Sequence, residues 1–321
     1  MSAETSDRLR FDPWGVPAVP VLSRQAHDRI AALRSDEAFL ERAWAAESSR
    51  VLVVSGNATV AAHRRPDGAA LILLSPRQVT AAGDRVLLGR AEGVVYFAVL
   101  SDAELGDGGW LGLRELAVAL DDLEIGLLTS AVALQAWHQR HPRCPRCGAL
   151  TRSTQAGWTR RCPIDGSDHF PRTDPAVIML IHDGAGRCVL ARGPQWPPGR
   201  MSVLAGFVEA GESAEAAVAR EVGEEVGIAV RDVAYVASQP HPFPSSLMLG
   251  FTGLVDGDPT LTIDKDEIVE AGWFTRAEVR RTVDWDADRP VPGNADRILR
   301  GLPPTMSIAR QLINSWLTWD D

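Results

Sequence analysis

Residues 206–228 read GFVEAGESAEAAVAREVGEEVGI, in which a glycine-rich loop runs into a stretch of strong helix formers. Apolar residues recur at intervals of three and four through the second half of this stretch, which predicts one helix over 214–226 with a buried stripe. On such a helix Glu221, Glu224 and Glu225 share one face, because steps of three and four residues return to the same side.

Three like charges on adjacent turns of a helix repel one another. Divalent ions such as Mg²⁺ or Mn²⁺ relieve that repulsion, since they take oxygen ligands and bridge readily to phosphates. A solvated acidic helix face is the alternative. It explains less well why a glycine, an arginine and four glutamates stand at one fixed spacing. The segment therefore predicts a divalent-metal site.

The spacing is G-x5-E-x7-R-E-U-x-E-E-x-G-U, with U an aliphatic residue, and the chain matches every defined position. In this the segment resembles the Nudix box. The resemblance implies hydrolysis of a nucleoside diphosphate linked to another moiety, on an α/β/α sandwich that carries the box on a strand, a loop and a helix. Gly223 stands inside the helix at a position that the motif leaves free, where it costs about 1 kcal/mol of helix stability relative to alanine.

The composition favours a multidomain chain without a membrane segment. A length of 321 residues allows two domains with a small module between them, and a net charge of −9 argues against general nucleic-acid binding through a basic surface. The polar N-terminus shows no secretory signal, and the longest apolar runs are too short to cross a bilayer. Four cysteines suit a reducing, cytoplasmic setting, and Cys188 is expected to be a small core residue.

The chain is expected to divide into an N-terminal domain over 1–137, a zinc-ribbon-like segment over 138–171 and a catalytic domain over 172–321. The first part combines two expected helices with short strand-like runs and shows no catalytic constellation; the helices span 35–47 and 124–138, and the runs begin at Val51, Thr59, Ala70, Arg85 and Val94. From Ala176 onward, strands lie on either side of the metal-bearing helix. This order predicts an α/β (α+β) fold with a mixed sheet and helices on its faces.

The cysteine segment contains one complete metal-binding half and one altered half. Cys144 and Cys147 form CPRCG, whose spacing suits half of a tetrahedral zinc site. The second half reads CPID from Cys162, so Asp165 stands where the fourth sulfur is usual. Asp165 could ligate zinc through oxygen, or a histidine at 141 or 169 through nitrogen. A ribbon that has lost its metal is the alternative, and the sequence leaves both open.

Residues 238–251 read SQPHPFPSSLMLGF, which resembles the SQPWPFPxS signature of the NADH pyrophosphatase (NudC-like) family of Nudix hydrolases. FPRTDPAVIMLI, IDKDEIVEAGWF and a late PPTMSIARQLI agree, so the resemblance covers about residues 136–316, and the N-terminal domain fits more loosely. It implies metal-dependent cleavage of NAD(H) to AMP and nicotinamide mononucleotide. It also implies removal of NAD caps from RNA 5′ ends, with the cap providing most of the recognition.

The family resemblance assigns the catalytic roles residue by residue. It implies divalent metals on Glu221, Glu224 and Glu225, with Glu267 of DKDEIVE as a further ligand from a separate loop. Arg220 would orient these carboxylates through charge-assisted hydrogen bonds. Either Glu225 or Glu267 would take the proton from the attacking water, and the sequence leaves that choice open.

The resemblance also implies substrate contacts. Phe207 would stack on a base of the dinucleotide, and Gln239, Ser246 and Ala309 fall where the family contacts substrate. The SQPHPFPSS loop would reach the pocket of the partner subunit in a homodimer. The structural alternatives are Phe207 as a core residue, the loop as a rigid connector, and Ala309 as a helix-packing residue.

Two positions depart from the family pattern. His241 replaces the tryptophan of the signature, which exchanges a large aromatic plane for a small titratable ring, and Phe170 stands where tyrosine is common. We therefore expect measurable but reduced NADH hydrolysis. Two other functions remain: a Nudix hydrolase of another dinucleotide such as ADP-ribose, and a catalytically weak Nudix domain that binds nucleotide.

Overall fold

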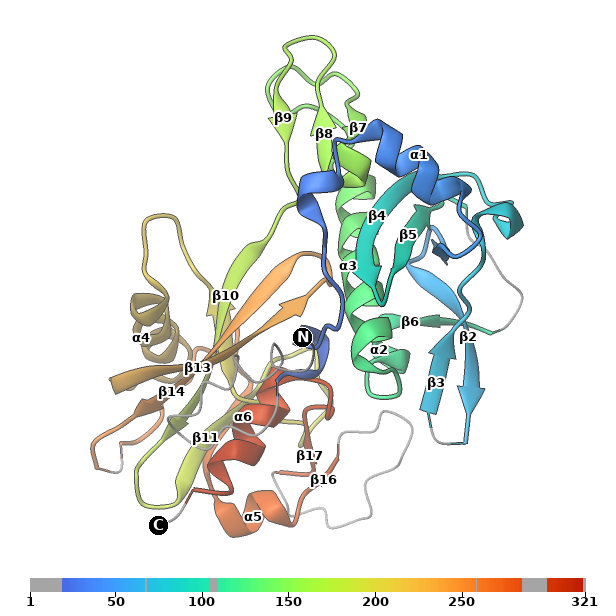
Figure 1. Ribbon diagram of the computed structural model, residues 1–321. Coiled ribbons are helices and arrows are strands. Elements are labelled where there is room, and N and C mark those ends of the chain that lie inside the picture. The colour runs from blue at the N-terminus through green and yellow to red at the C-terminus, as the bar shows by residue number, and fades with distance from the viewer. Residues whose placement is uncertain (1–18, 67, 104–108, 258, 285–298, 320–321) are drawn as a thin grey trace. The chain divides into compact units, whose positions relative to one another are not determined.

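A computed structural model describes residues 19–66, 68–103, 109–257, 259–284 and 299–319 of the chain. The chain divides into two units, each with its own core. Of the described residues, the first unit contains those within 21–174 and 240–247, and the second contains those within 19–20, 175–239 and 248–319. Figure 1 labels most of their helices and strands and colours the chain from its N-terminus to its C-terminus. Among the described residues, no helix combines the length and the apolar character that a membrane span requires.

The first unit is built on a six-stranded mixed sheet in the order β3-β2-β1-β5-β4, with β6 paired to β2. β1 runs parallel to β5 and antiparallel to β2. The strands are β1 (Arg50–Val54), β2 (Thr59–Arg65), β3 (Gly68–Leu71), β4 (Asp84–Ala91), β5 (Val94–Leu100) and β6 (Trp110–Gly112), and the helices are α1 (Glu37–Ala45), α2 (Leu113–Leu116) and α3 (Asp122–Arg140).

Both expected helices of this part are present, with shifted ends that their caps explain. The Asp36 side chain accepts a hydrogen bond from the Phe39 N–H and begins α1, and Asp121 does the same for α3. The run expected from Ala70 is shorter than its apolar sequence suggests, because β3 ends at Leu71. The other four expected runs are strands β1, β2, β4 and β5.

The first unit continues into a small three-stranded antiparallel sheet in the order β7-β8-β9, which we call the ribbon. Its strands are β7 (Arg152–Thr154), β8 (Thr159–Arg161) and β9 (Asp168–His169). The ribbon holds two tight cysteine-bearing turns, one before β7 and one between β8 and β9.

The second unit contains a six-stranded sheet in the order β13-β14-β10-β11-β15, with β12 paired antiparallel to β10. The strands are β10 (Asp174–His182), β11 (Arg187–Arg192), β12 (Leu204–Phe207), β13 (Arg231–His241), β14 (Ser246–Leu254) and β15 (Glu270–Thr275). The helices are α4 (Ala214–Val226), α5 (Arg276–Arg280) and α6 (Ile308–Trp316), and β16 (Val283–Asp284) pairs in parallel with β17 (Gly301–Leu302).

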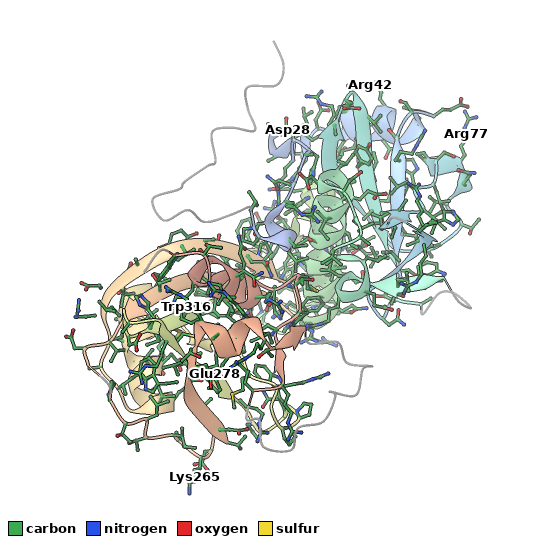
Figure 2. The ribbon with its side chains drawn as sticks, turned by 90° about the horizontal axis from the view of Figure 1, so that it is seen from below. Asp28, Arg42, Arg77, Lys265, Glu278 and Trp316 are labelled. Atoms are coloured by element: carbon green, nitrogen blue, oxygen red, sulfur yellow. The ribbon has the colours of Figure 1, made fainter. Side chains whose placement is uncertain are left out.

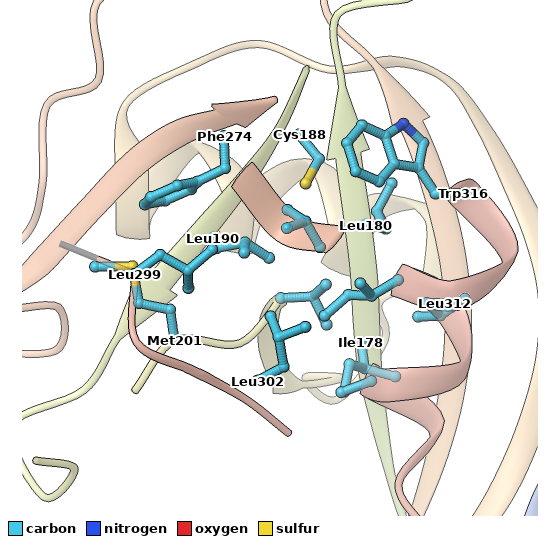
Figure 3. Packing of buried hydrophobic residues seen from close by; sticks show 14 of the residues in the cluster. Ile178, Leu180, Cys188, Leu190, Met201, Phe274, Leu299, Leu302, Leu312 and Trp316 are labelled. Carbon is cyan, nitrogen blue, oxygen red and sulfur yellow. The ribbon is translucent and has the colours of Figure 1, made fainter. Parts of the chain in front are cut away.

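The alternation of side chains along β10 places one helix layer on each face of this sheet. Val177 and Met179 are buried in the cluster that contains the apolar stripe of α4. Ile178 and Leu180 belong to the opposite cluster, with Trp316 and other residues of α6 (Figure 3). The expected α/β/α sandwich is therefore confirmed. Cys188 is fully buried in the second of these clusters, as expected of a small core residue.

A buried polar contact joins the ribbon to α3 within the first unit. His138 Nε2 lies 2.8 Å from the Gly157 carbonyl oxygen, and its Nδ1 lies 2.7 Å from Arg160 Nη1. A carbonyl can only accept, so Nε2 carries the hydrogen and Nδ1 accepts from the guanidinium. Burial is the main cause of the lowered pKa of His138, and the Arg160 charge also lowers it, against the raising effects of the Gly157 hydrogen bond and, less strongly, of Asp84.

We predict that this histidine destabilises the fold in acid. The unfolded chain takes up a proton near the ordinary pKa of 6.5, whereas folded His138 resists it, so stability falls as the pH drops below about 6.5. Thermal unfolding between pH 5 and 8 should show a midpoint that declines below that value, less steeply in His138→Gln. An equal decline of the unfolding midpoint with pH in both proteins would contradict the prediction.

Candidate functional site

Helix α4 has the bounds that the sequence predicted, and local chemistry sets both ends. The Ser213 side chain accepts from the Ala216 N–H at 3.2 Å and begins the helix. Gly227 ends it with a left-handed φ of 71°. The acidic residues therefore stand on a helix whose position is fixed by its buried stripe and its caps.

Three carboxylates gather at this helix. Glu221, Glu225 and Glu267 each offer an oxygen within 4.8 Å of the others. The loop that carries Glu267 is held against the end of α4 by main-chain hydrogen bonds: the Thr262 N–H donates to the Val226 carbonyl at 2.9 Å, and the Asp264 N–H to the Glu225 carbonyl at 3.2 Å. The cluster therefore joins residues that lie more than forty positions apart.

The electrostatics of this cluster fit a divalent cation. Burial raises the pKa of Glu225 to about 8, with further contributions from the charges of Glu221 and Glu267. Burial also raises the pKa of Glu221, against the lowering effect of Arg220. Glu225 Oε2 is buried and has no hydrogen-bond partner among the described residues. A hard cation would offset the repulsion and bind the unpartnered oxygen.

Arg220 organises the loop and the helix. Its guanidinium donates to Glu212 at 2.9 and 3.0 Å, to Glu221 Oε1 at 2.9 Å and to the Phe207 carbonyl at 2.9 Å. These ion pairs, that with Glu212 foremost, raise the pKa of Arg220, so it stays charged. Glu224 lies outside the three-carboxylate cluster: it is more than half exposed and accepts from Arg220 at 2.9 Å.

Gly206 on β12 permits the approach of strand and helix. An added Cβ at this position would lie 1.9 Å from Glu221 Cδ, which is impossible without displacing the carboxylate. The glycine that begins the sequence motif is therefore required by a close contact across 15 residues of chain. Phe207 follows it and leaves 60% of its surface exposed, so it is not a core residue.

The other two expected substrate residues of the second unit are buried. Gln239 on β13 is 1% exposed, and its Oε1 has no hydrogen-bond partner among the described residues. Ala309 on α6 packs in a core cluster, which is the helix-packing alternative that the sequence offered. It lies in the first turn of that helix, where N–H groups lack intrahelical acceptors.

The remaining three expected substrate residues lie in the first unit. His241 and Ser246 line a pocket of about 200 Å³ together with Trp158. Burial, and secondly the charge of Arg114, lower the pKa of His241 to about 4, so the ring is neutral at pH 7. Phe170 is 65% exposed.

The two turns of the ribbon have the same backbone structure. In each turn a glycine with left-handed φ donates its N–H to the carbonyl of the first cysteine: Gly148 to Cys144 at 2.9 Å and Gly166 to Cys162 at 3.1 Å. This equivalence places Asp165 in the second turn where Cys147 stands in the first. The sequence left Asp165, His141 and His169 as candidates for the fourth ligand, and the fold groups Asp165 with the three cysteines.

The four side chains fit a zinc ion. Ligand atoms of Cys144, Cys147, Cys162 and Asp165 lie within 4.8 Å of one another, and the Cys147 and Cys162 sulfurs are 3.5 Å apart, close to the edge of a tetrahedron with Zn–S bonds near 2.3 Å. Desolvation opposes ionisation of Cys144, but the N–H groups of Arg146 and Cys147 outweigh it and lower its pKa to about 6.

Ser167 completes this site and is absent from the expectations drawn from the sequence. Its hydroxyl and N–H donate to Asp165 Oδ1 at 2.5 and 2.9 Å, and they hold the pKa of Asp165 well below its usual range. The Asp-x-Ser spacing is typical of an Asx turn and is the signal that points to this residue.

We predict that Asp165 sets the zinc affinity of the ribbon. Asp165→Ala removes one ligand and should weaken zinc retention by on the order of tenfold or more, whereas Asp165→Cys, which restores four thiolates, should strengthen it. Zinc release to a chromogenic chelator, measured on both variants and the unchanged protein, checks this order of zinc affinities. An Asp165→Ala protein that retains zinc like the unchanged protein would show that the carboxylate is not a ligand.

Comparison with known proteins gives consistent matches along the chain. Models of three domain families match: the NUDIX domain over residues 172–292, the NADH pyrophosphatase zinc ribbon domain over 139–170, and the NADH pyrophosphatase-like rudimentary NUDIX domain over 48–137. The chain is 43% identical over 309 residues to a protein of Mycobacterium bovis named NAD-capped RNA hydrolase NudC, covering 93% of this chain and 95% of that protein.

Two further relatives carry related names. The Mycobacterium tuberculosis NAD-capped RNA hydrolase NudC is 42% identical with the same coverage. The human NAD-capped RNA hydrolase NUDT12 is 40% identical over 207 residues, which are 62% of this chain and 43% of that protein.

Proposed function

The chain belongs to the NADH pyrophosphatase family of Nudix hydrolases, and on that premise we propose that it hydrolyses the pyrophosphate bond of NAD(H) to AMP and nicotinamide mononucleotide and removes NAD caps from RNA 5′ ends. The cluster of Glu221, Glu225 and Glu267 carries this proposal, since it provides the acidic site that such cleavage requires. The relatives named for NAD-capped RNA support the substrate. The domain boundaries at 137/138 and 171/172 belong to the proposal, as does a cytoplasmic location, which the free cysteines favour.

Nudix hydrolases use divalent metals, and we assign Mg²⁺ or Mn²⁺ to the carboxylate cluster. When bound, such ions neutralise phosphate oxygens and lower the pKa of a bound water. Glu221, Glu225 and Glu267 would hold them, and Glu224 would become a further ligand if it gave up its hydrogen bond with Arg220. We choose Glu225 as the general base, because its buried Oε2 has no hydrogen-bond partner among the described residues and could accept the proton of the attacking water. Exposed Glu267 is the alternative base.

The substrate contacts follow from the exposed and unpartnered groups. Phe207 offers an exposed ring for stacking on a base, and the Gln239 carbonyl oxygen offers an unused acceptor. Ser246, Phe170 and the Ala309 main chain complete the assigned contacts. We assign the SQPHPFPSS loop to the partner's pocket in a homodimer.

A hydrolase of another dinucleotide is the second candidate, and His241 is the observation that favours it. The ring is small and neutral where the family signature has a tryptophan, so it encloses a flat base less completely. A pocket changed in this way could favour an ADP-ribose-like substrate.

Product analysis tests these functions on one sample. NADH, NAD, ADP-ribose and NAD-capped RNA are incubated with Mg²⁺ or Mn²⁺, and AMP and nicotinamide mononucleotide are quantified. We expect both products from NADH and a 5′-monophosphate RNA from the capped substrate. Faster release of AMP from ADP-ribose than from NADH would favour the second candidate. Binding of NADH without formation of AMP would indicate a nucleotide-binding domain without catalysis.

A further inference from the structure

The charge of the chain is unevenly distributed. Residues 139–170 contain six arginines and two aspartates, a formal charge of +4, in a chain whose formal net charge is −9. A zinc ion with three ionised thiolates lowers the local value by one, so the loaded ribbon remains positive. The net charge of the whole chain argued against contact with an RNA chain. The excess of arginines in residues 139–170 nevertheless provides a local basic surface.

Most of these arginines are available at the surface. Arg160 is buried and donates its hydrogens to His138 and Thr151. The other five are exposed: Arg140, Arg143, Arg146, Arg152 and Arg161. Apart from Arg140, which ends α3, these exposed arginines belong to the ribbon, so the ribbon presents positive charge to solvent.

Two of the exposed arginines stand directly opposite each other. The register of β7 and β8 pairs Arg152 with Arg161, so both side chains lie on the same face of the ribbon. Like charges in this position destabilise a sheet unless an anion lies between them. Asp168 pairs with Arg161 from β9 at 3.8 Å, and among the described residues no acidic group lies within salt-bridge distance of Arg152.

The remaining acidic group of the ribbon is also engaged. Asp165 lies 4.0 Å from Arg146, but it accepts hydrogen bonds from Ser167 and belongs to the zinc cluster. When zinc is bound, the metal would neutralise part of the negative charge of Asp165. The face that carries Arg152 and Arg161 thus has more positive than negative charge of its own.

We propose that this face of the ribbon binds the phosphate backbone of a single-stranded RNA, namely the chain that follows the NAD cap. The inference rests on the proposed function, which makes an RNA body part of the substrate. Arginine forks match phosphate oxygens in geometry and charge, and such contacts raise affinity without reading sequence. Contacts of the ribbon with the RNA chain add affinity that free NADH does not receive.

The test uses the zinc-loaded full chain and the double variant Arg152→Gln/Arg161→Gln. Affinity for an uncapped single-stranded RNA is measured by fluorescence anisotropy across a salt series. We expect the Kd to rise roughly 5- to 10-fold, and the slope of log K against log salt to shrink by about 1.4, for two lost phosphate contacts. The kcat/KM for NAD-capped RNA should fall with it, while kcat/KM for NADH stays unchanged.

Two controls separate charge from structure. Arg152→Lys/Arg161→Lys keeps the charge and should keep the salt slope. Arg42→Gln/Arg77→Gln removes two arginines that project from the surface outside the ribbon (Figure 2), and it should leave RNA affinity unchanged. Zinc content equal to that of the unchanged protein verifies that each variant folds.

The inference and the proposed function can fail separately. If the chain cleaves NADH and leaves NAD-capped RNA intact, the proposed removal of NAD caps is wrong. The anisotropy of uncapped RNA then still tests whether the ribbon binds RNA. An Arg152→Gln/Arg161→Gln protein with the same Kd and salt slope as the unchanged protein overturns the inference. Absence of RNA binding by the unchanged protein overturns it as well.

Discussion

Glu225→Gln is expected to lower NADH turnover by about a thousandfold and to leave the metal-free fold intact. The proposed base loses its proton-accepting oxygen, and the cation loses a ligand. In the metal-free protein the pKa of Glu225 is about 8, so its carboxyl is largely protonated at pH 7 and a neutral amide of the same shape replaces it with little change. The substitution should therefore lower NADH turnover strongly, whereas the unfolding midpoint of the metal-free protein should hardly change.

Three measurements check this result. AMP release reports turnover, thermal unfolding without metal reports the fold, and the rise of the midpoint with added Mn²⁺ reports cation binding, which should be smaller in the variant. Glu215→Gln is the matched control, because Glu215 is an exposed carboxylate in the first turn of the same helix. Wild-type turnover in Glu225→Gln would falsify the assigned role of this residue.

Gly206→Ala is expected to lower turnover by about a hundredfold, although it adds a single methyl group. The new Cβ would stand 1.9 Å from Glu221 Cδ and 2.0 Å from its Oε1, so the carboxylate must move away from the cluster. Displacement of a catalytic group by about 1 Å can cost a factor of 10². The loss should appear in kcat and in metal-dependent stabilisation together.

Gly223→Ala is the matched control for this substitution. Gly223 belongs to the same motif and lies on α4, but its added Cβ meets nothing within 4 Å. Alanine there should stabilise the helix by about 1 kcal/mol and leave turnover unchanged. Gly206→Ala with unimpaired turnover would show that the close contact between strand and helix is not needed for catalysis.

The sequence could predict much of the second unit because the relevant signals are local. The strong helix formers and the apolar period predicted the bounds of α4, and helix geometry fixes which of its side chains share a face. The same geometry placed Glu221 and Glu225 together. It also grouped Glu224 with them, and the structure turns that side chain toward Arg220 instead.

The ribbon shows where sequence reasoning stops. Residue spacing identified Cys144, Cys147 and Cys162 as ligand candidates, and it left Asp165 beside two histidines as possible fourth ligands. Only the folded turns bring Asp165, and neither histidine, into one cluster with the three cysteines. The opposition of arginines on β7 and β8 is likewise a matter of strand register, which the sequence does not specify.

The amino-acid sequence by itself determined the helix over 214–226, its acidic face and the family to which the chain belongs, because short-range backbone geometry and residue type decide these. The tertiary structure alone decided that Glu267 reaches α4, that Glu225 is desolvated enough to raise its pKa, and that Gly206 leaves room for Glu221. Distances across a fold depend on how separate segments pack. Burial, which changes the energy of a charge, exists only after they have packed.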